Sequence, residues 1–174
     1  MKVAVTGSKG FIGKNLCSHL RERNYEILEI HRDTHLDDIE SHLSQADFIF
    51  HLAGVNRPKD TVEFHSGNVD FTAFIVDAVL RAATGAPIVL ASSTQADQDN
   101  EYGISKRSAE KIVMDYTATT GFPTYIYRLP NVFGKWCKPN YNSFVATFCH
   151  QLHAGEDITV HSPEAKVKLV YIDD

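Results

Sequence analysis

The sequence has little that would direct it to a membrane or to nucleic acid. Lysine and arginine total 17 against 22 aspartates and glutamates, which gives a formal net charge of -5 and a pI near 6.0. Binding to a phosphate backbone needs a basic surface, which this balance does not supply. No apolar run approaches the roughly 18 residues of a membrane-spanning helix. We therefore expect no nucleic-acid partner and no membrane contact.

Cysteine is also scarce, and the sequence has only Cys17, Cys137 and Cys149. These residues are widely spaced and form no paired-thiol motif, which is typical of a reducing compartment. The first residues reach a glycine without the apolar stretch of a signal peptide. We expect a cytoplasmic protein. His150 and His153 lie three residues apart, but no complete ligand set accompanies them, so no metal site is expected.

Short apolar runs alternate with longer helical patterns, which is typical of repeated β-α-β units around a parallel sheet. The expected strands are residues 3–6, 26–30, 47–52, 87–92 and 123–127, and the expected helices are 11–23, 36–43, 63–83 and 101–119. The predicted fold class is α/β, a Rossmann-type doubly wound parallel sheet with helices on both faces. Phenylalanines at helical spacing in 63–83 are interpreted as packing, and a homodimer interface on that helix is the open alternative.

The pattern changes after residue 130. Residues 131–141 are rich in Pro, Asn, Lys and Gly and are expected to form a loop. A helix at 143–153 and short strands at 158–160 and 167–171 should follow. We interpret 131–174 as the start of a small substrate-binding subdomain, which belongs to a longer protein because the sequence stops directly after an apolar strand.

A glycine-rich segment, TGSKGFIG at 6–13, stands where the first expected strand turns into the first expected helix. Backbone N–H groups at a helix N-terminus face an anion, and glycines let a pyrophosphate approach them closely. A plain strand-to-helix turn is the alternative interpretation. The cofactor contacts expected from this segment are Gly7, Lys9, Gly10, Phe11, Ile12 and Gly13. Residues 1–130 are therefore predicted to be an NADP-binding Rossmann domain.

The choice of cofactor follows from the end of the second expected strand, which continues into His31 and Arg32. NAD is usually held there by an acidic residue on the ribose 2′-hydroxyl, whereas a guanidinium pairs with the 2′-phosphate of NADP. NADP(H) is therefore predicted, with Lys9 able to assist from the loop. Asp33 or Glu29 could still serve the hydroxyl, and a solvated Arg32 is the alternative.

Tyr102 and Lys106 lie four residues apart at the start of an expected helix, so their side chains share one face. An ammonium beside a phenol stabilises the phenolate, and we expect it to lower the pKa of Tyr102. Ser93 follows the fourth strand and could hold a carbonyl oxygen for protonation; Thr94 remains the alternative, with Ser92 less favoured. For an isolated pair, an aromatic residue beside a solvated lysine is the ordinary interpretation.

These motifs together resemble the extended short-chain dehydrogenase/reductase family, also described as the NAD-dependent epimerase/dehydratase family. Its members carry a G-x-x-G-x-x-G loop, an active-site Ser or Thr and a Tyr-x-x-x-Lys pair. Further similar segments are HLAG at 51–54, NV at 68–69, RLPNVFG at 128–134 and VYIDD at 170–174. The resemblance implies cofactor contacts at Leu52, Ala53, Gly54, Tyr102 and Lys106. It also implies that Asn131 binds a nucleotide sugar, together with Ser93.

Two segments, HLAGVNRP at 51–58 and FGKWCKPNYNS at 133–143, resemble the bacterial capsular-polysaccharide reductases of UDP-linked 4-keto-2-acetamido-2,6-dideoxy-hexoses. The resemblance implies NADPH-dependent formation of UDP-N-acetyl-6-deoxy-talosamine, a precursor of N-acetylfucosamine, and a missing C-terminal region with a cupin domain. A nucleotide-sugar epimerase or dehydratase is the second interpretation. A non-catalytic redox sensor or scaffold is the third, and the intact Tyr-x-x-x-Lys pair disfavours it.

Overall fold

The computed structural model describes residues 1–160 and 162–174. It contains two compact units, Met1–Arg128 and Leu129–Asp174. The division falls two residues before the boundary expected from the sequence.

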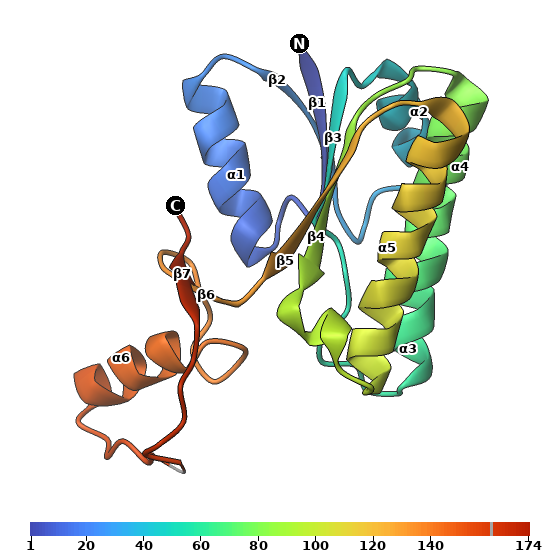
Figure 1. Ribbon diagram of the computed structural model, residues 1–174. Coiled ribbons are helices and arrows are strands. Elements are labelled where there is room, and N and C mark those ends of the chain that lie inside the picture. The colour runs from blue at the N-terminus through green and yellow to red at the C-terminus, as the bar shows by residue number, and fades with distance from the viewer. Residues whose placement is uncertain (161) are drawn as a thin grey trace. The chain divides into compact units, whose positions relative to one another are not determined.

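The first unit is built on a five-stranded sheet with the order β2-β1-β3-β4-β5 (Figure 1). The strands are β1 (Lys2–Thr6), β2 (Glu26–Ile30), β3 (Phe48–His51), β4 (Ile88–Ser93) and β5 (Thr124–Leu129). Strand β1 pairs in parallel with β2 on one side and β3 on the other, with Val3 opposite Ile27 and Phe48. The chain reverses its direction of travel across the sheet between β1 and β3. Such a switch point is where open α/β sheets bind ligands, outside the carboxyl ends of the strands.

Helices cover both faces of this sheet, which confirms the predicted fold class (Figure 1). Helix α1 (Phe11–Glu22) lies on one face, and α2 (Leu36–Gln45), α4 (Phe71–Ala82) and α5 (Glu101–Thr120) lie on the other. Alternation along β1 explains the two cores, because successive side chains point to opposite faces. Val3 and Val5 pack with Cys17 of α1, whereas Ala4 belongs to the larger core on the opposite face.

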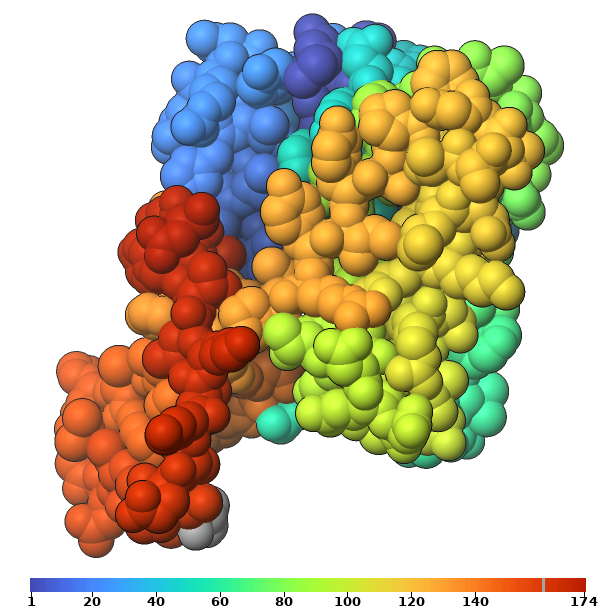
Figure 2. All heavy atoms as spheres, viewed as in Figure 1, coloured from blue at the N-terminus to red at the C-terminus, as the bar shows by residue number. Residues whose placement is uncertain are grey.

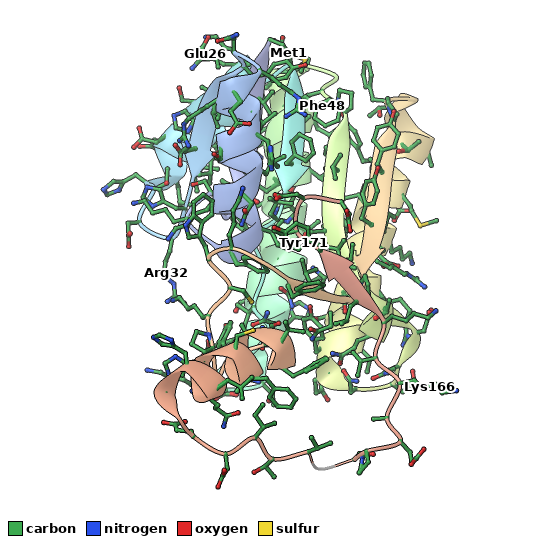
Figure 3. The ribbon with its side chains drawn as sticks, turned by 90° about the vertical axis from the view of Figure 1, so that its left-hand side faces the viewer. Met1, Glu26, Arg32, Phe48, Lys166 and Tyr171 are labelled. Carbon is green, nitrogen blue, oxygen red and sulfur yellow. The ribbon has the colours of Figure 1, made fainter. Side chains whose placement is uncertain are left out.

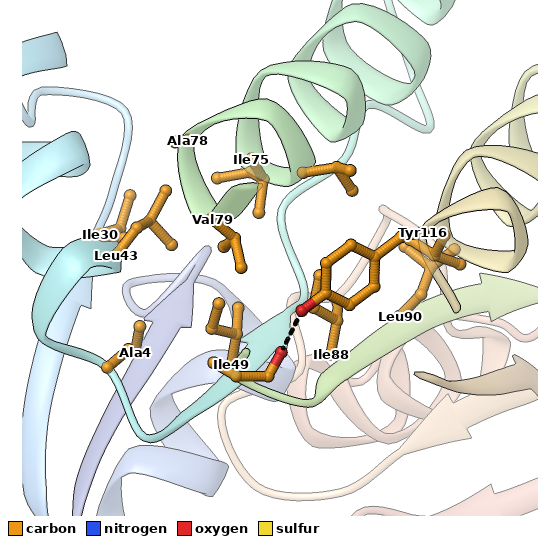
Figure 4. Close-up of a cluster of buried hydrophobic side chains, with 14 of the residues drawn as sticks. Ala4, Ile30, Leu43, Ile49, Ile75, Ala78, Val79, Ile88, Leu90 and Tyr116 are labelled. Carbon is orange, nitrogen blue, oxygen red and sulfur yellow. Dashed lines mark hydrogen bonds between the residues drawn. The ribbon is translucent and has the colours of Figure 1, made fainter. Parts of the chain in front are cut away.

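The larger core is a continuous set of buried aliphatic side chains with one aromatic residue at its edge (Figure 4). Tyr116 of α5 is 3% exposed, and its hydroxyl donates a 3.1 Å hydrogen bond to the carbonyl oxygen of Ala86. The bond satisfies the one polar atom that this ring carries into the core. It also joins the far end of α5 to the chain entering β4.

The long helix expected at 63–83 is three segments: α3 (Val62–Phe64), a π-helical stretch at His65–Asp70, and α4. The expected helix is therefore present as one continuous helical run, and the unforeseen feature is its π-helical stretch. Asn68 lies in the π-helical stretch, accepts a 2.7 Å bond from the backbone N of Val55 and donates a 2.9 Å bond to its carbonyl oxygen. A widened turn of this kind often marks a functional position. These tertiary bonds hold Asn68 there, and a periodic apolar pattern does not reveal them.

The second unit contains β6 (Asn131–Phe133), α6 (Phe144–Ala154) and β7 (Leu169–Tyr171). β6 and β7 pair in parallel, so the expectation of a loop throughout 131–141 is wrong at its first residues. The strand expected at 158–160 is also wrong, since these residues are irregular. Ser143 caps α6, accepting a 3.4 Å bond from the backbone N of Ala146. Pairing with a segment far along the chain decides which apolar tripeptides become strands.

Strand β5 lies at the edge of the five-stranded sheet and at the molecular surface (Figure 2). Its Tyr125 and Tyr127 side chains are exposed. Over the described residues, none of the helices is both long and apolar enough to cross a membrane.

Candidate active site

The glycine-rich segment forms the turn from β1 into α1. At two of its positions, Gly7 and Gly13, a side chain would collide with backbone atoms. Gly7 has a φ of +70°, and a Cβ there would lie 2.9 Å from the backbone N of Ala53. A Cβ on Gly13 would lie 2.1 Å from the carbonyl oxygen of Gly7. The turn therefore folds tightly on itself and against the segment after β3. Any side chain at either position would force the backbone apart.

The N-terminus of α1 fits the pyrophosphate of a dinucleotide. Gly10 is its N-cap and supplies no side-chain hydrogen bond, and the first turn, which begins with Phe11 and Ile12, contains no acidic residue. The helix N–H groups thus keep their capacity to bind an anion. Within the described residues, the buried Ser8 hydroxyl in the same turn has no hydrogen-bond partner. Lys9 is exposed beside it.

The end of β2 lies against this turn, because the backbone N of Ser8 donates a 3.2 Å bond to the carbonyl oxygen of Ile30. His31 comes next and is tied into its own loop, with its backbone N donating to Thr34 Oγ1 at 3.0 Å. Arg32 projects outward from this loop (Figure 3). The acidic alternative Glu29 is engaged in an ion pair with Arg21.

A hydrogen-bond chain connects the end of β1 to the end of β3. The backbone N–H groups of Leu52 and Ala53 both donate to Thr6 Oγ1, at 3.1 and 3.0 Å. The Thr6 hydroxyl proton is therefore directed to His51 Nδ1, 2.7 Å away, and His51 Nε2 donates to Thr72 Oγ1 at 2.9 Å. Burial lowers the pKa of His51 to about 3, with a further contribution from the charge of Lys106. The imidazole is thus neutral and fixed in one tautomer.

The predicted catalytic hydroxyl and phenol meet at the end of β4. Ser93 is the last residue of β4, and its hydroxyl lies near enough to the Tyr102 phenol, at the start of α5, to lower the pKa of Tyr102. Its oxygen also accepts a 3.2 Å bond from the backbone N of Gln95. The alternative residues lie elsewhere: Thr94 is exposed, and the Ser92 hydroxyl donates to Glu110. The geometry therefore favours Ser93 among the three hydroxyls.

The expected effect of Lys106 on the Tyr102 phenol is wrong for this structure. Burial raises the pKa of Tyr102, and the Ser93 hydroxyl lowers it only in part. Lys106 Nζ donates instead to the carbonyl oxygen of Ala91, at 2.7 Å. Since the ring also packs against Phe64, with centroids 5.6 Å apart, desolvation dominates. Tyr102 is consequently protonated at neutral pH.

Lys106 is 5% exposed and lies near Gly54, in the segment that follows β3. A Cβ placed on Gly54 would be 3.7 Å from Lys106 Nζ and 2.9 Å from Asn68 Oδ1. Burial lowers the pKa of Lys106 to about 8, and the nearby Glu110 carboxylate opposes that shift. Lys106 thus lies next to the segment that packs against the glycine turn.

Sequence reasoning did not assign roles to several polar residues in this region. Asn68 Nδ2 donates to Ser105 Oγ at 2.9 Å, and Ser105 donates to the carbonyl oxygen of Tyr102 at 2.7 Å. The π-helical stretch is thereby tied to the first turn of α5. The signal available in the sequence was the presence of polar residues such as Asn68 and Ser105 at positions that the helical pattern assigns to a buried face. A buried polar group is costly unless it is hydrogen-bonded, so such residues are expected to have partners.

Asn131, the expected substrate ligand, begins β6 in the second unit. Its Nδ2 donates a 2.9 Å bond to the carbonyl oxygen of Asn142. Over residues 1–160 and 162–174 its Oδ1 has no hydrogen-bond partner. That acceptor is therefore available to a donor group of a ligand.

The first unit has a Rossmann-type doubly wound fold, with Ser93 at the end of β4 and with Tyr102 and Lys106 on the first turns of α5. The chain matches the model of the NAD dependent epimerase/dehydratase family over residues 3–174. It belongs to that family.

Two close relatives carry names from capsule and sugar-nucleotide chemistry. The chain is 48% identical over 175 residues to the UDP-2-acetamido-2,6-beta-L-arabino-hexul-4-ose reductase of Pseudomonas aeruginosa, covering 100% of this chain and 47% of that protein. It is 44% identical to the capsular polysaccharide assembling protein CapF of Staphylococcus aureus, with a TM-score of 0.88, covering 100% of this chain and 46% of CapF. The chain thus spans about half the length of these relatives.

A more distant structure shares the fold. The UDP-glucose 4-epimerase of Thermotoga maritima, solved with UDP-glucose, has a TM-score of 0.86 at 18% identity, over 99% of this chain and 70% of the epimerase. This similarity supports the doubly wound architecture and nothing more specific.

Proposed function

We propose that the full-length protein reduces the 4-keto group of a UDP-linked 2-acetamido-2,6-dideoxy-hexose with NADPH. The observation that carries this proposal is the meeting of Ser93 and Tyr102 at the end of β4, with Lys106 beside the segment that packs on the glycine turn. The name of the 48% identical relative supports the substrate class. In this reading the product is UDP-N-acetyl-6-deoxy-talosamine, made for a cell-surface polysaccharide.

The cofactor preference rests on the residues around the end of β2. Arg32 is exposed, and within the described residues it forms no ion pair with a carboxylate. Glu29 is already paired with Arg21, so it is a poor acceptor for a ribose hydroxyl. Arg32, Lys9 and the buried Ser8 hydroxyl would surround a 2′-phosphate, and the α1 N-terminus would bind the pyrophosphate. The family description names only NAD dependence, so NADPH is part of the proposal.

The residues at the end of β4 have distinct tasks in ketone reduction. NADPH supplies a hydride to the carbonyl carbon, and negative charge then develops on the oxygen. The Ser93 hydroxyl stabilises that oxygen by hydrogen bonding, and Tyr102 gives it a proton. The raised pKa of Tyr102 keeps the proton on the phenol until an alkoxide is present to accept it. Lys106, as an ammonium beside Gly54, would donate a hydrogen bond to the nicotinamide ribose and so position the nicotinamide ring near the carbonyl carbon.

We also propose that the half of the relatives' length that lies outside this chain contains the rest of the sugar pocket and a cupin domain. Asn131 Oδ1 would contribute to that pocket from the second unit. A homodimer through the α4 and α5 surface belongs to the same proposal, since Leu80 and Met114 of these helices are exposed.

The test is a direct assay of the full-length protein. NADPH absorbance is followed with the UDP-linked 4-keto-2-acetamido-2,6-dideoxy-hexose, with UDP-glucose as the comparison substrate, and the product is identified by mass spectrometry. The proposal expects stoichiometric NADPH consumption and a product heavier by two hydrogens with the keto sugar alone. Protein that retains NAD through purification and converts a sugar without net NADPH consumption would instead be an epimerase or dehydratase. Retained nucleotide without turnover would favour a sensor or scaffold.

A further inference from the structure

Glu110 is a buried carboxylate that the reaction outlined above does not use. It lies on α5 one helical turn beyond Lys106 and is 5% exposed. Arg128 of β5 donates two hydrogen bonds to the Glu110 carboxylate, from Nε to Oε1 at 2.9 Å and from Nη2 to Oε2 at 2.6 Å. The Ser92 hydroxyl donates to Oε1 as well. Such bidentate, charge-assisted pairing fixes a carboxylate in both position and ionisation.

The Glu110 contacts lead directly to the candidate catalytic groups. Ser92, which bonds Glu110, stands between Ala91, whose carbonyl oxygen accepts from Lys106, and Ser93, which lies near Tyr102. Strand β4 is therefore joined to α5 at successive residues. A shift of Glu110 would move the end of β4 relative to α5. The distance between the Ser93 hydroxyl and the Tyr102 phenol would then change.

The Glu110 carboxylate also interacts electrostatically with the Lys106 ammonium. Burial raises the pKa of Glu110, but hydrogen bonds from Arg128 and Ser92 and the charges of Arg128 and Lys106 bring it below its usual range. The charge of Lys106 also acts on His51, which is neutral. Among the other charged groups, Arg107 pairs with Asp99 and Arg128 also pairs with Asp97, whereas Glu101, Lys111 and Asp115 of α5 are exposed.

We propose that Glu110 is a positioning residue that keeps Lys106 in its ammonium form and, through Ser92, holds Ser93 against Tyr102. The inference rests on the proposed reductase function. It assigns the carboxylate no contact with substrate or cofactor. Glu110 acts only through the two side chains that it orders.

The experiment compares three variants of the full-length protein. Glu110→Gln removes the charge, and Arg128 keeps its 2.5 Å bond to Asp97, so the guanidinium stays paired. Glu110→Asp keeps the charge at shorter reach. Asp99→Asn is the matched control, because it removes a carboxylate from an exposed ion pair with Arg107 near the same helix.

Two quantities are measured for each variant. The first is the pKa of Lys106, from the pH dependence of its ¹³Cε NMR signal in protein labelled with ¹³C-lysine and assigned with Lys106→Arg. The second is the pH dependence of kcat for NADPH-dependent reduction. Removal of an opposite charge at close range should lower the pKa of Lys106 by about one unit or more. At pH 8, the ammonium fraction and kcat should then fall roughly fivefold, whereas KM for NADPH changes little.

The outcomes separate this inference from the proposed function. Glu110→Asp should restore most of the Lys106 pKa, and Asp99→Asn should leave it at the wild-type value. A folded Glu110→Gln protein whose Lys106 titrates as in the wild type would overturn the inference. If Glu110→Gln does not fold, Ser92→Ala, which removes the Ser92 bond to Glu110, takes its place, and an unchanged kcat in that variant overturns the positioning role. Should the wild type reduce no keto sugar, the proposed function fails while the NMR titration still decides the role of Glu110.

Discussion

Replacing Gly13 with alanine separates helix propensity from the geometry of the glycine turn. Gly13 lies inside α1, where an alanine ordinarily stabilises a helix by about 1 kcal/mol relative to glycine. Here the new Cβ would lie 2.1 Å from the carbonyl oxygen of Gly7 and 2.8 Å from the Cα of Ser8. Both neighbours are backbone, so the turn itself must move by more than 1 Å. We expect a net destabilisation of about 1–3 kcal/mol, opposite in sign to the propensity.

The displaced turn should also bind its cofactor less well. Urea unfolding of the full-length protein measures the change in stability, and calorimetric titration measures NADPH affinity, for which we expect a loss of roughly tenfold or more. Lys14→Ala is the control, because Lys14 is exposed at the next helical position and should change stability by only a few tenths of a kcal/mol. A Gly13→Ala protein that is as stable as the wild type and binds NADPH equally well would refute the steric reasoning.

Three further outcomes are expected. Arg32→Ala should weaken NADPH binding by roughly 10–100-fold and leave NADH binding nearly unchanged, which calorimetric titration with both cofactors would measure. Equal losses of affinity for the two cofactors would contradict a contact between Arg32 and the 2′-phosphate. Arg23→Ala is the control variant. Tyr102→Phe should lower kcat for keto-sugar reduction by at least about 100-fold with NADPH affinity within about twofold, and substantial remaining turnover would exclude this phenol as the acid. Burial lowers the pKa of His51 from its ordinary value of 6.5 to about 3, so the unfolded chain binds the extra proton and stability falls as pH drops below about 6.5. The loss should reach about 2 kcal/mol at pH 5 in urea unfolding, and His51→Gln should lack this part of the slope; equal slopes would mean that His51 is not buried neutral.

Much of the first unit could be predicted because its signals are local. The strand and helix at 26–30 and 101–119 follow from apolar periodicity and came within a residue of the observed bounds. The turn at 6–13 was recognisable because glycines at those spacings have few other uses after a strand. The Tyr102 and Lys106 pair needed only the four-residue spacing of a helix to share one face.

Other features depend on partners far along the chain. The π-helical stretch around Asn68 exists where its side chain bonds Val55 and Ser105. Strand β6 exists because residues 169–171 pair with it. Neither can be read from a local window, since a lone tripeptide or a helical repeat has the same pattern whether or not its partner is present.

The linear order of residues was sufficient to define the α/β class, the glycine turn after β1 and the placement of Tyr102 and Lys106 on one helix. Tertiary structure alone decided which of Ser92, Ser93 and Thr94 meets Tyr102, because three adjacent hydroxyls differ only in the direction that the end of β4 gives them. It also decided the direction in which the pKa of Tyr102 shifts, which is upward because of burial, and the contacts of Glu110 with Ser92 and Arg128. Electrostatic effects depend on desolvation and distance, and these quantities exist only once the chain has folded.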